Sequence, residues 1–283
     1  MGKPQRAPSF EGADNPLAAA VNERDRDTLK MVERAIGNKH VMLAFQPVVQ
    51  SRGNGKVAFY EGLIRVLDAT GRVIPARDFI DVVETQELGR KIDVLALEQG
   101  LLELHQFPDL RLSINMSARS IGYPAWRETL DAALAKNSTI AERLILEITE
   151  SSAMMVPDLV TVFMAELHRQ GISFALDDFG AGFTSFRYLR DFYFDILKID
   201  GQFIRDVSTD TDNQVLTQAL VSIGQQLDMY TVAESVENQS DANFLTACGI
   251  DCLQGYYYAA PTTSPPWWER EGMCDEMGHK PKR

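Results

Sequence analysis

Ionisable and amide side chains interrupt seven of the apolar segments of this chain. Glu61 lies within one such segment, Glu147 lies within another, and a third ends in the pair Asp177-Asp178. A charge in a buried strand is costly unless it is paired or bound to a metal. Because seven segments share this feature, one common site explains it better than separate local ion pairs do. The remaining interruptions are Asn115, Lys198, Glu234, Glu237 and Gln254.

The types of side chain narrow the chemistry of this site. Carboxylate and amide oxygens are hard donors, which suit Mg²⁺ or Mn²⁺ rather than a metal that prefers thiolate or imidazole. The interrupted segments contain no histidine, which disfavours a histidine-based zinc hydrolase. Neighbouring carboxylates repel one another, and two divalent cations would nearly cancel five negative charges. The candidate metal ligands are Glu61, Asn115, Glu147, Asp177, Asp178 and Glu234.

The elements that must position these residues are eight apolar segments, which alternate with stretches of helical periodicity. Near-continuous apolar strands are covered on both faces, as in parallel sheets. Eight such units predict an α/β fold, a single (β/α)8 TIM-barrel-like domain whose strand ends converge on one face. A doubly wound open sheet is the alternative. The segments are 41–49, 57–66, 110–117, 143–150, 172–179, 194–200, 229–237 and 249–258.

The two ends of the chain differ in composition from the region between them. Residues 1–22 are polar and rich in Pro, Gly and Ala, which predicts a flexible N-terminal segment. The predicted domain covers 23–265. Residues 266–283 form a C-terminal tail, which Trp267 and Trp268 are expected to pack against the barrel.

Charge and cysteine content exclude several classes of protein. The chain has 283 residues and a formal net charge of −12, which argues against binding to duplex nucleic acid or to an anionic membrane. A small anionic ligand held through metal ions remains compatible with this charge. No signal peptide or membrane segment is recognisable. Three cysteines, an odd and sparse set, indicate a reducing compartment and hence a cytoplasmic location.

Eight short motifs contain the residues singled out above. They are Gln46-Pro47, Glu61-Gly62-Leu63-Ile64-Arg65, Asn115-Met116-Ser117, Glu147-Ile148-Thr149-Glu150, Asp177-Asp178-Phe179-Gly180, Lys198-Ile199-Asp200, Glu234-Ser235-Val236-Glu237 and Gln254-Gly255-Tyr256. Their order resembles that of EAL domains, a family of cyclic di-GMP phosphodiesterases, and the similarity covers about residues 28–262. The resemblance implies an EAL-type barrel with one antiparallel strand and hydrolysis of cyclic di-GMP to linear pGpG.

The resemblance implies a role for each matching position. Two cations, Mg²⁺ or Mn²⁺, would occupy the site, with Asp177 and Asp178 between them. Glu234 would bind the second metal or its water and is the candidate general base, and Lys198 would orient the attacking water. The implied catalytic set is Glu234, Lys198, Glu61 and Asp178. The implied substrate-binding set, with Arg65 on a phosphate, is Gln46, Leu63, Arg65, Gln254, Glu237 and Pro261.

The resemblance also implies a mobile element and a partner. The segment Asp178–Ser185 resembles the loop of the family that couples metal binding to dimerisation, and Glu150 would anchor it. A homodimer would then form through the surface beside residues 178–190, together with a regulatory partner of unidentified type.

Three positions depart from the family pattern. Gly62 replaces Ala and is expected to loosen the backbone slightly. Ser235 replaces Gly and would be strained at positive φ by about 1 kcal/mol. Ala260 replaces a basic residue that precedes Pro261 in relatives. Because no metal ligand is lost, hydrolysis is favoured over the alternatives, which are a cyclic di-GMP receptor, a protein-interaction module and an unrelated metal hydrolase.

Overall fold

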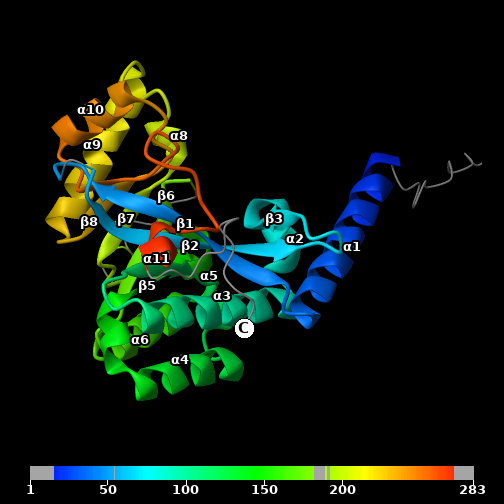
Figure 1. Cartoon of the computed structure of the whole chain (residues 1–283). Helices are drawn as coiled ribbons and strands as arrows, with labels where there is room; N and C mark the ends of the chain where they lie inside the picture. Colours follow the sequence, from blue (N-terminus) through cyan, green and yellow to red (C-terminus); the bar gives the residue numbers. More distant parts are fainter. Residues whose placement is uncertain (1–15, 54, 182–188, 190–191, 271–283) are drawn as a thin grey trace, which may run out of the picture.

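Every apolar segment that predicts a strand contains one in the structure. The computed structural model describes residues 16–53, 55–181, 189 and 192–270 (Figure 1). The barrel strands are β1 (Val41–Gln50), β2 (Val57–Leu67), β4 (Leu112–Asn115), β5 (Leu144–Thr149), β6 (Ser173–Phe179), β7 (Ile196–Ile199), β8 (Tyr230–Ala233) and β9 (Cys252–Leu253). Neighbours follow the order β1-β9-β8-β7-β6-β5-β4-β2, and pairing of β1 with β2 closes the ring.

Strand β1 runs antiparallel to both of its neighbours, whereas the other strands of the barrel pair in parallel. The connection from β1 to β2 is a short turn, and a turn of this length can join only antiparallel strands. The predicted barrel with one antiparallel strand is therefore confirmed, and the alternative prediction of an open doubly wound sheet is wrong. A short strand β3 (Val73–Pro75) extends the sheet outside the barrel by pairing antiparallel with β2.

Helices cover the outside of the barrel. Figure 1 shows α3, α4 and α6 on one side of the strands and α8, α9 and α10 on another. The helices are α1 (Pro16–Gly37), α2 (Ile80–Val83), α3 (Glu87–Gln106), α4 (Pro124–Lys136), α5 (Glu150–Met155), α6 (Pro157–His168), α8 (Gly201–Ile204), α9 (Thr211–Gln226), α10 (Gln239–Cys248) and α11 (Pro266–Arg270). Single-turn 3₁₀ helices lie at Ala76–Asp78 and Ala118–Ser120, and a longer one at Ser138–Arg143. Within the part of the chain that the structure describes, no helix has the length and hydropathy that a membrane crossing needs.

Helix α1 lies at the outer end of the β1–β2 hairpin, beside α2 and β3 (Figure 1). Its inner face buries Val32 and Ala35 against the core. The helix begins at Pro16, before residue 23, where the sequence predicts the domain to start. Part of the segment predicted to be flexible is therefore helical, and residues 1–15 lie outside the described residues.

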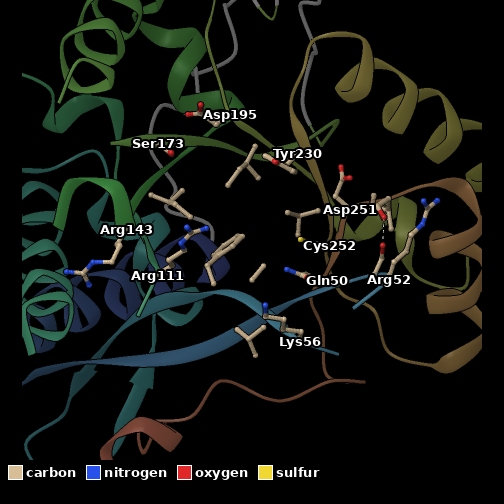
Figure 2. Close-up of a pocket in the computed structure, with 18 of the residues that line it drawn as sticks. Gln50, Arg52, Lys56, Arg111, Arg143, Ser173, Asp195, Tyr230, Asp251 and Cys252 are labelled. Atoms are coloured by element: carbon tan, nitrogen blue, oxygen red, sulfur yellow. Dashed lines mark hydrogen bonds between the residues drawn. The ribbon is translucent and has the colours of Figure 1, made fainter. Parts of the chain in front are cut away.

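The two mouths of the barrel differ. The C-terminal ends of the parallel strands carry the ionisable residues that the sequence singles out. The opposite end, where these strands begin, opens into a cavity of about 980 Å³ (Figure 2). A layer of apolar side chains lies inside the barrel between the two ends, and it consists of Val48, Phe59, Ile145, Ala175, Ile196, Val232 and Cys252.

Helix α11 docks the C-terminal segment onto the barrel, as the two tryptophans predict. Thr262 and Phe45 of β1 form an antiparallel β-bridge, in which the backbone N–H of each residue donates to the carbonyl oxygen of the other. The indole Nε1 groups of Trp267 and Trp268 both donate to Oε2 of the buried Glu103 in α3, at 3.1 and 2.9 Å. The ring of Trp267 also packs edge-on against Phe45. Residues 271–283 of the predicted tail lie outside the described residues.

Removing the buried Trp268 side chain should destabilise the whole domain. We expect Trp268→Ala to lower the free energy of unfolding by about 3 kcal/mol, because it empties a buried aromatic site. It also removes one of the two indole donors to Glu103. Urea unfolding followed by far-UV circular dichroism measures the change. Tyr193→Ala serves as the control, since that side chain is 69% exposed and its loss should change stability by less than about 0.5 kcal/mol. Equal effects of the two variants would contradict the docking role.

Candidate metal centre and active site

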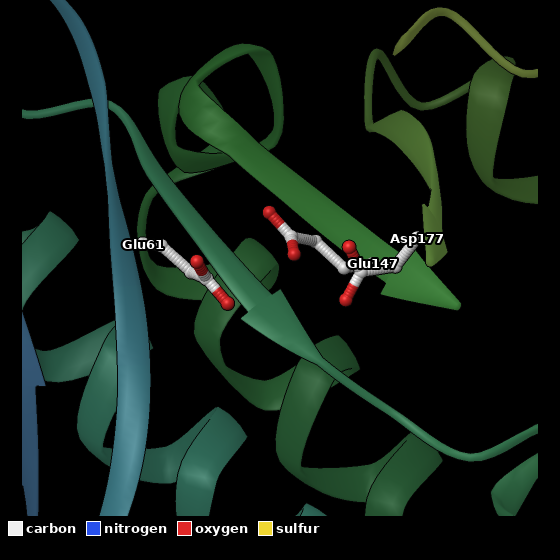
Figure 3. A group of neighbouring side chains, drawn as sticks. All are labelled: Glu61, Glu147 and Asp177. Carbon is white, nitrogen blue, oxygen red and sulfur yellow. The ribbon is translucent and has the colours of Figure 1, made fainter. Parts of the chain in front are cut away.

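Three carboxylates from three strands meet inside the C-terminal end of the barrel (Figure 3). Glu61 comes from β2, Glu147 from β5 and Asp177 from β6, and oxygens of the three lie within 4.8 Å of one another. Side chains alternate along a strand, so each of these residues faces the interior while its neighbours face the helices. The sequence prediction that these strand residues share one site is consistent with this arrangement.

A second group of carboxylates lies beside the first. Oxygens of Asp177, Asp178 and Glu234 also lie within 4.8 Å of one another. Asp178 can join Asp177 on the same side because its backbone has a φ of 53°, a left-handed conformation that turns the chain at the end of β6. Asp177 therefore belongs to both groups. Two cation positions that share one carboxylate are the arrangement that a two-metal site requires.

Lys198 of β7 is buried at the centre of the carboxylates. Its Nζ lies 2.7 Å from Oε2 of Glu147 and 2.7 Å from Oε1 of Glu234. It also forms an ion pair at 2.9 Å with Asp177 Oδ1 and one at 3.6 Å with Glu61 Oε2. Burial alone would lower the pKa of Lys198, but the surrounding negative charges outweigh it and raise the pKa well above its ordinary value. The ammonium therefore stays charged.

One ammonium does not neutralise the carboxylates around it. Burial, followed by the charge of Glu61, raises the pKa of Glu147 to about 8. Burial and the charge of Asp177 raise the pKa of Asp178 to about 6. Burial also raises the pKa of Glu234 well above its usual range, against the attraction of Lys198. Further positive charge at this position would hold these groups ionised.

The donor set fits divalent cations. Oε1 of Glu147 is buried and has no hydrogen-bond partner among the described residues. Oδ1 of Asp177 faces Lys198 without hydrogen-bond geometry. Carboxylate oxygens that are buried and incompletely bonded are what Mg²⁺ or Mn²⁺ would bind. Metal binding at these residues nevertheless stays a prediction.

Amide side chains hold Glu61 from two sides. Asn115 Nδ2 donates to Glu61 Oε1 at 2.9 Å, which leaves the Asn115 carbonyl oxygen available as a ligand. Gln254 Nε2 donates to Glu61 Oε2 at 2.6 Å and to Gln46 Oε1 at 3.3 Å. Gln46 in turn donates to the backbone oxygen of Ala259 at 3.1 Å. Gln46 and Gln254 are both buried, and Gln254 links Gln46 to Glu61; their implied role in binding substrate stays a prediction.

The other residues of the implied substrate-binding set lie around this centre. Arg65 is half-buried, its Nη1 donates to the backbone oxygen of Ile64, and burial lowers its pKa. Leu63 and Pro261 are partly exposed. Glu237 is exposed beyond β8, and in the described residues no hydrogen bond or ion pair joins it to the carboxylates.

Glu150 makes the contact expected of a loop anchor. Its Oε2 accepts a hydrogen bond of 3.0 Å from the backbone N–H of Gly180, directly after β6. Gln202 Nε2 donates to the backbone oxygen of Gly180 at 3.1 Å, an interaction that the motifs do not indicate. Gly180 has a φ of 95°, which glycine adopts without strain. Residues 182–188 of the predicted loop lie outside the described residues.

Sequence reasoning missed the residues that fix the turn after Asn115. Asp93 of α3 is buried, and its Oδ2 accepts from the backbone N–H of Ser117 at 3.0 Å and from Oγ of Ser120 at 2.6 Å. Ser152 Oγ accepts from the backbone N–H of Ala118 at 2.8 Å. The signal available in the sequence is an aspartate on the apolar face of a helix, which indicates a buried hydrogen-bonding role.

Gly62 lies in a crowded part of the barrel. A Cβ at this position would lie 2.8 Å from Ile114 Cδ1 and 3.3 Å from Leu43 Cδ1. An alanine here would therefore require neighbouring side chains to shift. The expected loosening of the backbone stays a prediction.

Ser235, which follows Glu234, has a φ of 55°, as the comparison with the family glycine predicts. Left-handed conformations cost a residue with a Cβ roughly 1–2 kcal/mol. Its Oγ accepts a hydrogen bond of 3.3 Å from Nη2 of Arg205, a long contact at the surface. The strain therefore lies next to a candidate catalytic residue.

Relieving this strain should stabilise the protein. We expect Ser235→Gly to raise the free energy of unfolding by about 1 kcal/mol, because glycine adopts positive φ freely. Ser235→Ala is the matched control: it removes the same hydroxyl but keeps the Cβ, so it should give no gain. Urea unfolding of both variants measures the difference. If alanine stabilises as much as glycine does, the strain at Ser235 is not the cause.

Comparisons with known proteins identify the family to which this barrel is similar. Residues 29–261 match the model of the EAL domain family. The bifunctional diguanylate cyclase/cyclic di-GMP phosphodiesterase MucR of Pseudomonas aeruginosa is 28% identical over 251 residues, which cover 86% of this chain and 36% of MucR. Cyclic di-GMP phosphodiesterase PdeF of Escherichia coli is 29% identical over 237 residues, which cover 82% of this chain and 31% of PdeF. The chain thus spans about a third of the length of these curated relatives.

Solved structures share the fold. The PaMucR phosphodiesterase in complex with c-di-GMP superposes with a TM-score of 0.73 at 30% identity and covers 83% of this chain and 97% of its own. The FimX EAL domain from Pseudomonas aeruginosa bound to c-di-GMP gives a TM-score of 0.76 at 25% identity, covering 84% and 97%. The match of the family model over most of the chain, together with the shared barrel, shows that this chain belongs to the EAL domain family.

Proposed function

We propose that this chain hydrolyses one phosphodiester bond of cyclic di-GMP to give linear pGpG, with two divalent cations, Mg²⁺ or Mn²⁺. The observation that carries the proposal is the position of Asp177 in two carboxylate groups at once. The choice of substrate rests on relatives that are named cyclic di-GMP phosphodiesterases. Two bound cations supply Lewis-acid stabilisation of the charge that develops on the phosphate and lower the pKa of water.

The ligands divide between two positions. Glu61, Glu147 and Asp177 surround the first, where the free oxygen of Asn115 can complete the set. Asp177, Asp178 and Glu234 surround the second. Gln254 and Asn115 each donate to a different oxygen of Glu61, so the carboxylate is oriented before a cation arrives.

Proton transfer falls to Glu234 and Lys198. Glu234 combines a raised pKa with partial exposure at the mouth of the barrel, so it can accept a proton from an attacking water. The Lys198 ammonium lies 2.7 Å from Glu234, where it can orient the same water and stabilise charge on the phosphate. Arg65 binds a phosphate oxygen through the N–H groups that Ile64 leaves free.

One observation supports a second candidate function, which is binding of cyclic di-GMP without efficient hydrolysis. Ser235 holds a strained backbone next to Glu234, and a small error in the aim of a general base can lower turnover strongly. Such a protein would act as a receptor or an interaction module. An assay of cyclic di-GMP hydrolysis together with a measurement of cyclic di-GMP binding separates the two functions.

Removing the shared carboxylate should abolish turnover. We expect purified protein to convert cyclic di-GMP to pGpG with Mn²⁺ or Mg²⁺, and none after treatment with a chelator, as followed by chromatography. Asp177→Asn should lower kcat by at least about 10²-fold, because both cation positions lose a ligand. Glu128→Gln is the control with the same change of charge at an exposed position of α4. Full activity of Asp177→Asn would refute the two-cation site, whereas inactive wild type that still binds cyclic di-GMP would favour the receptor.

The stability of chelated protein should fall as the pH rises from 6 to 8.5. Glu147 has a folded-state pKa of about 8, above its usual 4.5, so the folded state binds more protons than the unfolded state in this range. Stability must then decrease with pH and be lost as pH passes the folded pKa. Thermal unfolding across this range measures the slope. Glu147→Gln should flatten it, and saturating Mn²⁺ should reduce it by holding the carboxylates ionised. A slope of the opposite sign in chelator would contradict the crowded-carboxylate description.

An apolar stripe supports the expected homodimer. Met155, Val156, Leu159 and Val162 are all exposed and run from the end of α5 into α6, where Leu159 and Val162 are three residues apart. Helix α5 also packs against β6, whose C-terminal end leads into the predicted loop. Exposed apolar residues grouped in this way are suited to an interface with a second copy of the chain.

A charge in this stripe should prevent association. We expect wild-type protein to give the mass of a dimer by light scattering at micromolar concentration and Val162→Asp to give a monomer, because the aspartate would be buried without a partner. Val215→Asp is the matched control, since Val215 of α9 is exposed to the same degree at 66% against 67%. A wild-type monomer, or a dimer that survives Val162→Asp, would rule out this interface.

A further inference from the structure

The N-terminal mouth of the barrel is a cavity that the proposed function does not use. Its volume of about 980 Å³ lies at the upper end of the range of small-molecule sites, about 300–1,000 Å³. Residues at the starts of the parallel strands line it, together with Gln50 at the end of β1 (Figure 2). One layer of apolar side chains separates the cavity from the carboxylates.

The floor of the cavity is apolar. Phe59, Ile145, Ile196, Val232 and Cys252 line it, and all five belong to the apolar layer inside the barrel. Their buried side chains offer dispersion contacts and release of water to an apolar body, but no hydrogen bond.

The rim of the cavity carries unpaired cations. Lys56, Arg111 and Arg52 are exposed, and none of their side chains has a hydrogen bond or ion pair with another described residue. Figure 2 shows Lys56 and Arg111 directed over the cavity. Arg143 differs, because it donates to the backbone oxygens of Phe107 and Leu110 and is committed to the fold.

The two acidic groups nearest to the strand starts are already bonded. Asp195 Oδ2 accepts from the backbone N–H of Phe174 at 2.8 Å and contacts His168 Nε2 at 2.9 Å. Asp251 Oδ2 accepts from the backbone N–H and the hydroxyl of Thr231, both at 2.8 Å.

Two exposed carboxylates, Asp109 and Glu142, complete the acidic lining. Asp109 interacts electrostatically with Arg143. The lining as a whole carries four basic and four acidic side chains, but among its exposed members Lys56, Arg111 and Arg52 outnumber the two carboxylates.

We propose that this mouth binds a small molecule that combines an apolar body with one anionic group. The body would rest on the apolar floor, and the anion would contact Lys56 and Arg111. This pairing is favourable because the cations are already at the rim and need not break an existing ion pair. The site shares no residue with the carboxylate cluster, so its existence does not rest on the proposed hydrolysis.

The floor connects this mouth to the carboxylates. Phe59 precedes Glu61 by two residues, and the same spacing relates Ile145 to Glu147 and Ile196 to Lys198. Residues two apart in a strand face the same side, so each floor residue lies directly below a member of the cluster. Val232 and Cys252 stand in the same relation to Glu234 and Gln254. An occupant of the mouth would therefore contact the layer on which the proposed cation ligands rest. We expect its binding to change their affinity for cations, a coupling that rests on the proposed function.

Calorimetry with 8-anilinonaphthalene-1-sulfonate, an aromatic sulfonate, tests the site on the whole chelated chain. We expect one equivalent to bind, and each of the single variants Lys56→Glu and Arg111→Glu to bind several-fold more weakly, with at least about a tenfold loss in the double variant. Arg169→Glu is the control matched in charge to each single variant, since Arg169 follows α6 outside the cavity lining and its Nε donates to the backbone oxygen of Ala165. N-phenyl-1-naphthylamine, which has the same body without the sulfonate, should bind more weakly than the sulfonate and should not respond to the charge reversal.

Labelling of Cys252 provides a second readout of location. Cys252 lies in the floor, whereas the half-buried Cys248 does not line the cavity. The sulfonate should slow alkylation of Cys252 by iodoacetamide several-fold relative to Cys248, as measured by peptide mass spectrometry. An unchanged affinity in the double variant, or equal protection of the two cysteines, would overturn the proposal.

Mn²⁺ titrations test the coupling. The affinity for Mn²⁺ with and without the sulfonate must differ by the same factor as the affinity for the sulfonate with and without Mn²⁺. Identical affinities would overturn the coupling. A protein that binds the sulfonate at the mouth but binds no Mn²⁺ would overturn the proposed function and leave the site at the mouth standing.

Discussion

The arrangement of the barrel depends on one buried ammonium among four carboxylates. Lys198 contacts Glu61, Glu147, Asp177 and Glu234, which come from β2, β5, β6 and the end of β8. It therefore joins strands on several sides of the ring through charge rather than through packing. A single positive charge leaves the cluster strongly negative. Burial, and after it the charge of Glu61, raises the pKa of Glu147 to about 8, so added positive charge would be favourable here. The ion pairs of Lys198 thus hold the carboxylates together but neutralise only one of their charges.

The reversed strand β1 contributes directly to this centre. In the antiparallel register of β1 with β2, Gln46 lies opposite Glu61. Gln254, which follows β9 on the other side of β1, reaches both residues with one amide nitrogen. A barrel of parallel strands alone would place a different residue of β1 at this height. The antiparallel hairpin thus supplies Gln46, which accepts a hydrogen bond from the same Gln254 amide that holds Glu61.

Local sequence patterns predict the strands and the cluster, but not the contacts that depend on packing. The apolar segments predict eight strands because burial on both faces leaves a continuous apolar signature, and Glu61, Glu147 and Asp177 interrupt it because a buried charge must have a partner. Gly62 cannot be interpreted in this way, since its role depends on Ile114 from a neighbouring strand. The hydrogen bonds from Trp267 and Trp268 to Glu103 could not be predicted either, because they join segments that are far apart in sequence. The start of α1 at Pro16 lies in a segment whose composition alone predicts flexibility.

The apolar layer beneath the carboxylates is as much a part of the site as the ligands are. Ile145, Ile196 and Val232 lie two residues before Glu147, Lys198 and Glu234, so the inner side of the cluster faces hydrocarbon and not water. Desolvation is the largest cause of the raised pKa of Glu147 and Glu234, and this layer imposes it. The same carboxylates over a hydrated floor would keep their ordinary pKa values and would have less to gain from a cation. The protonation of the centre therefore depends on apolar residues as well as on the charged ones.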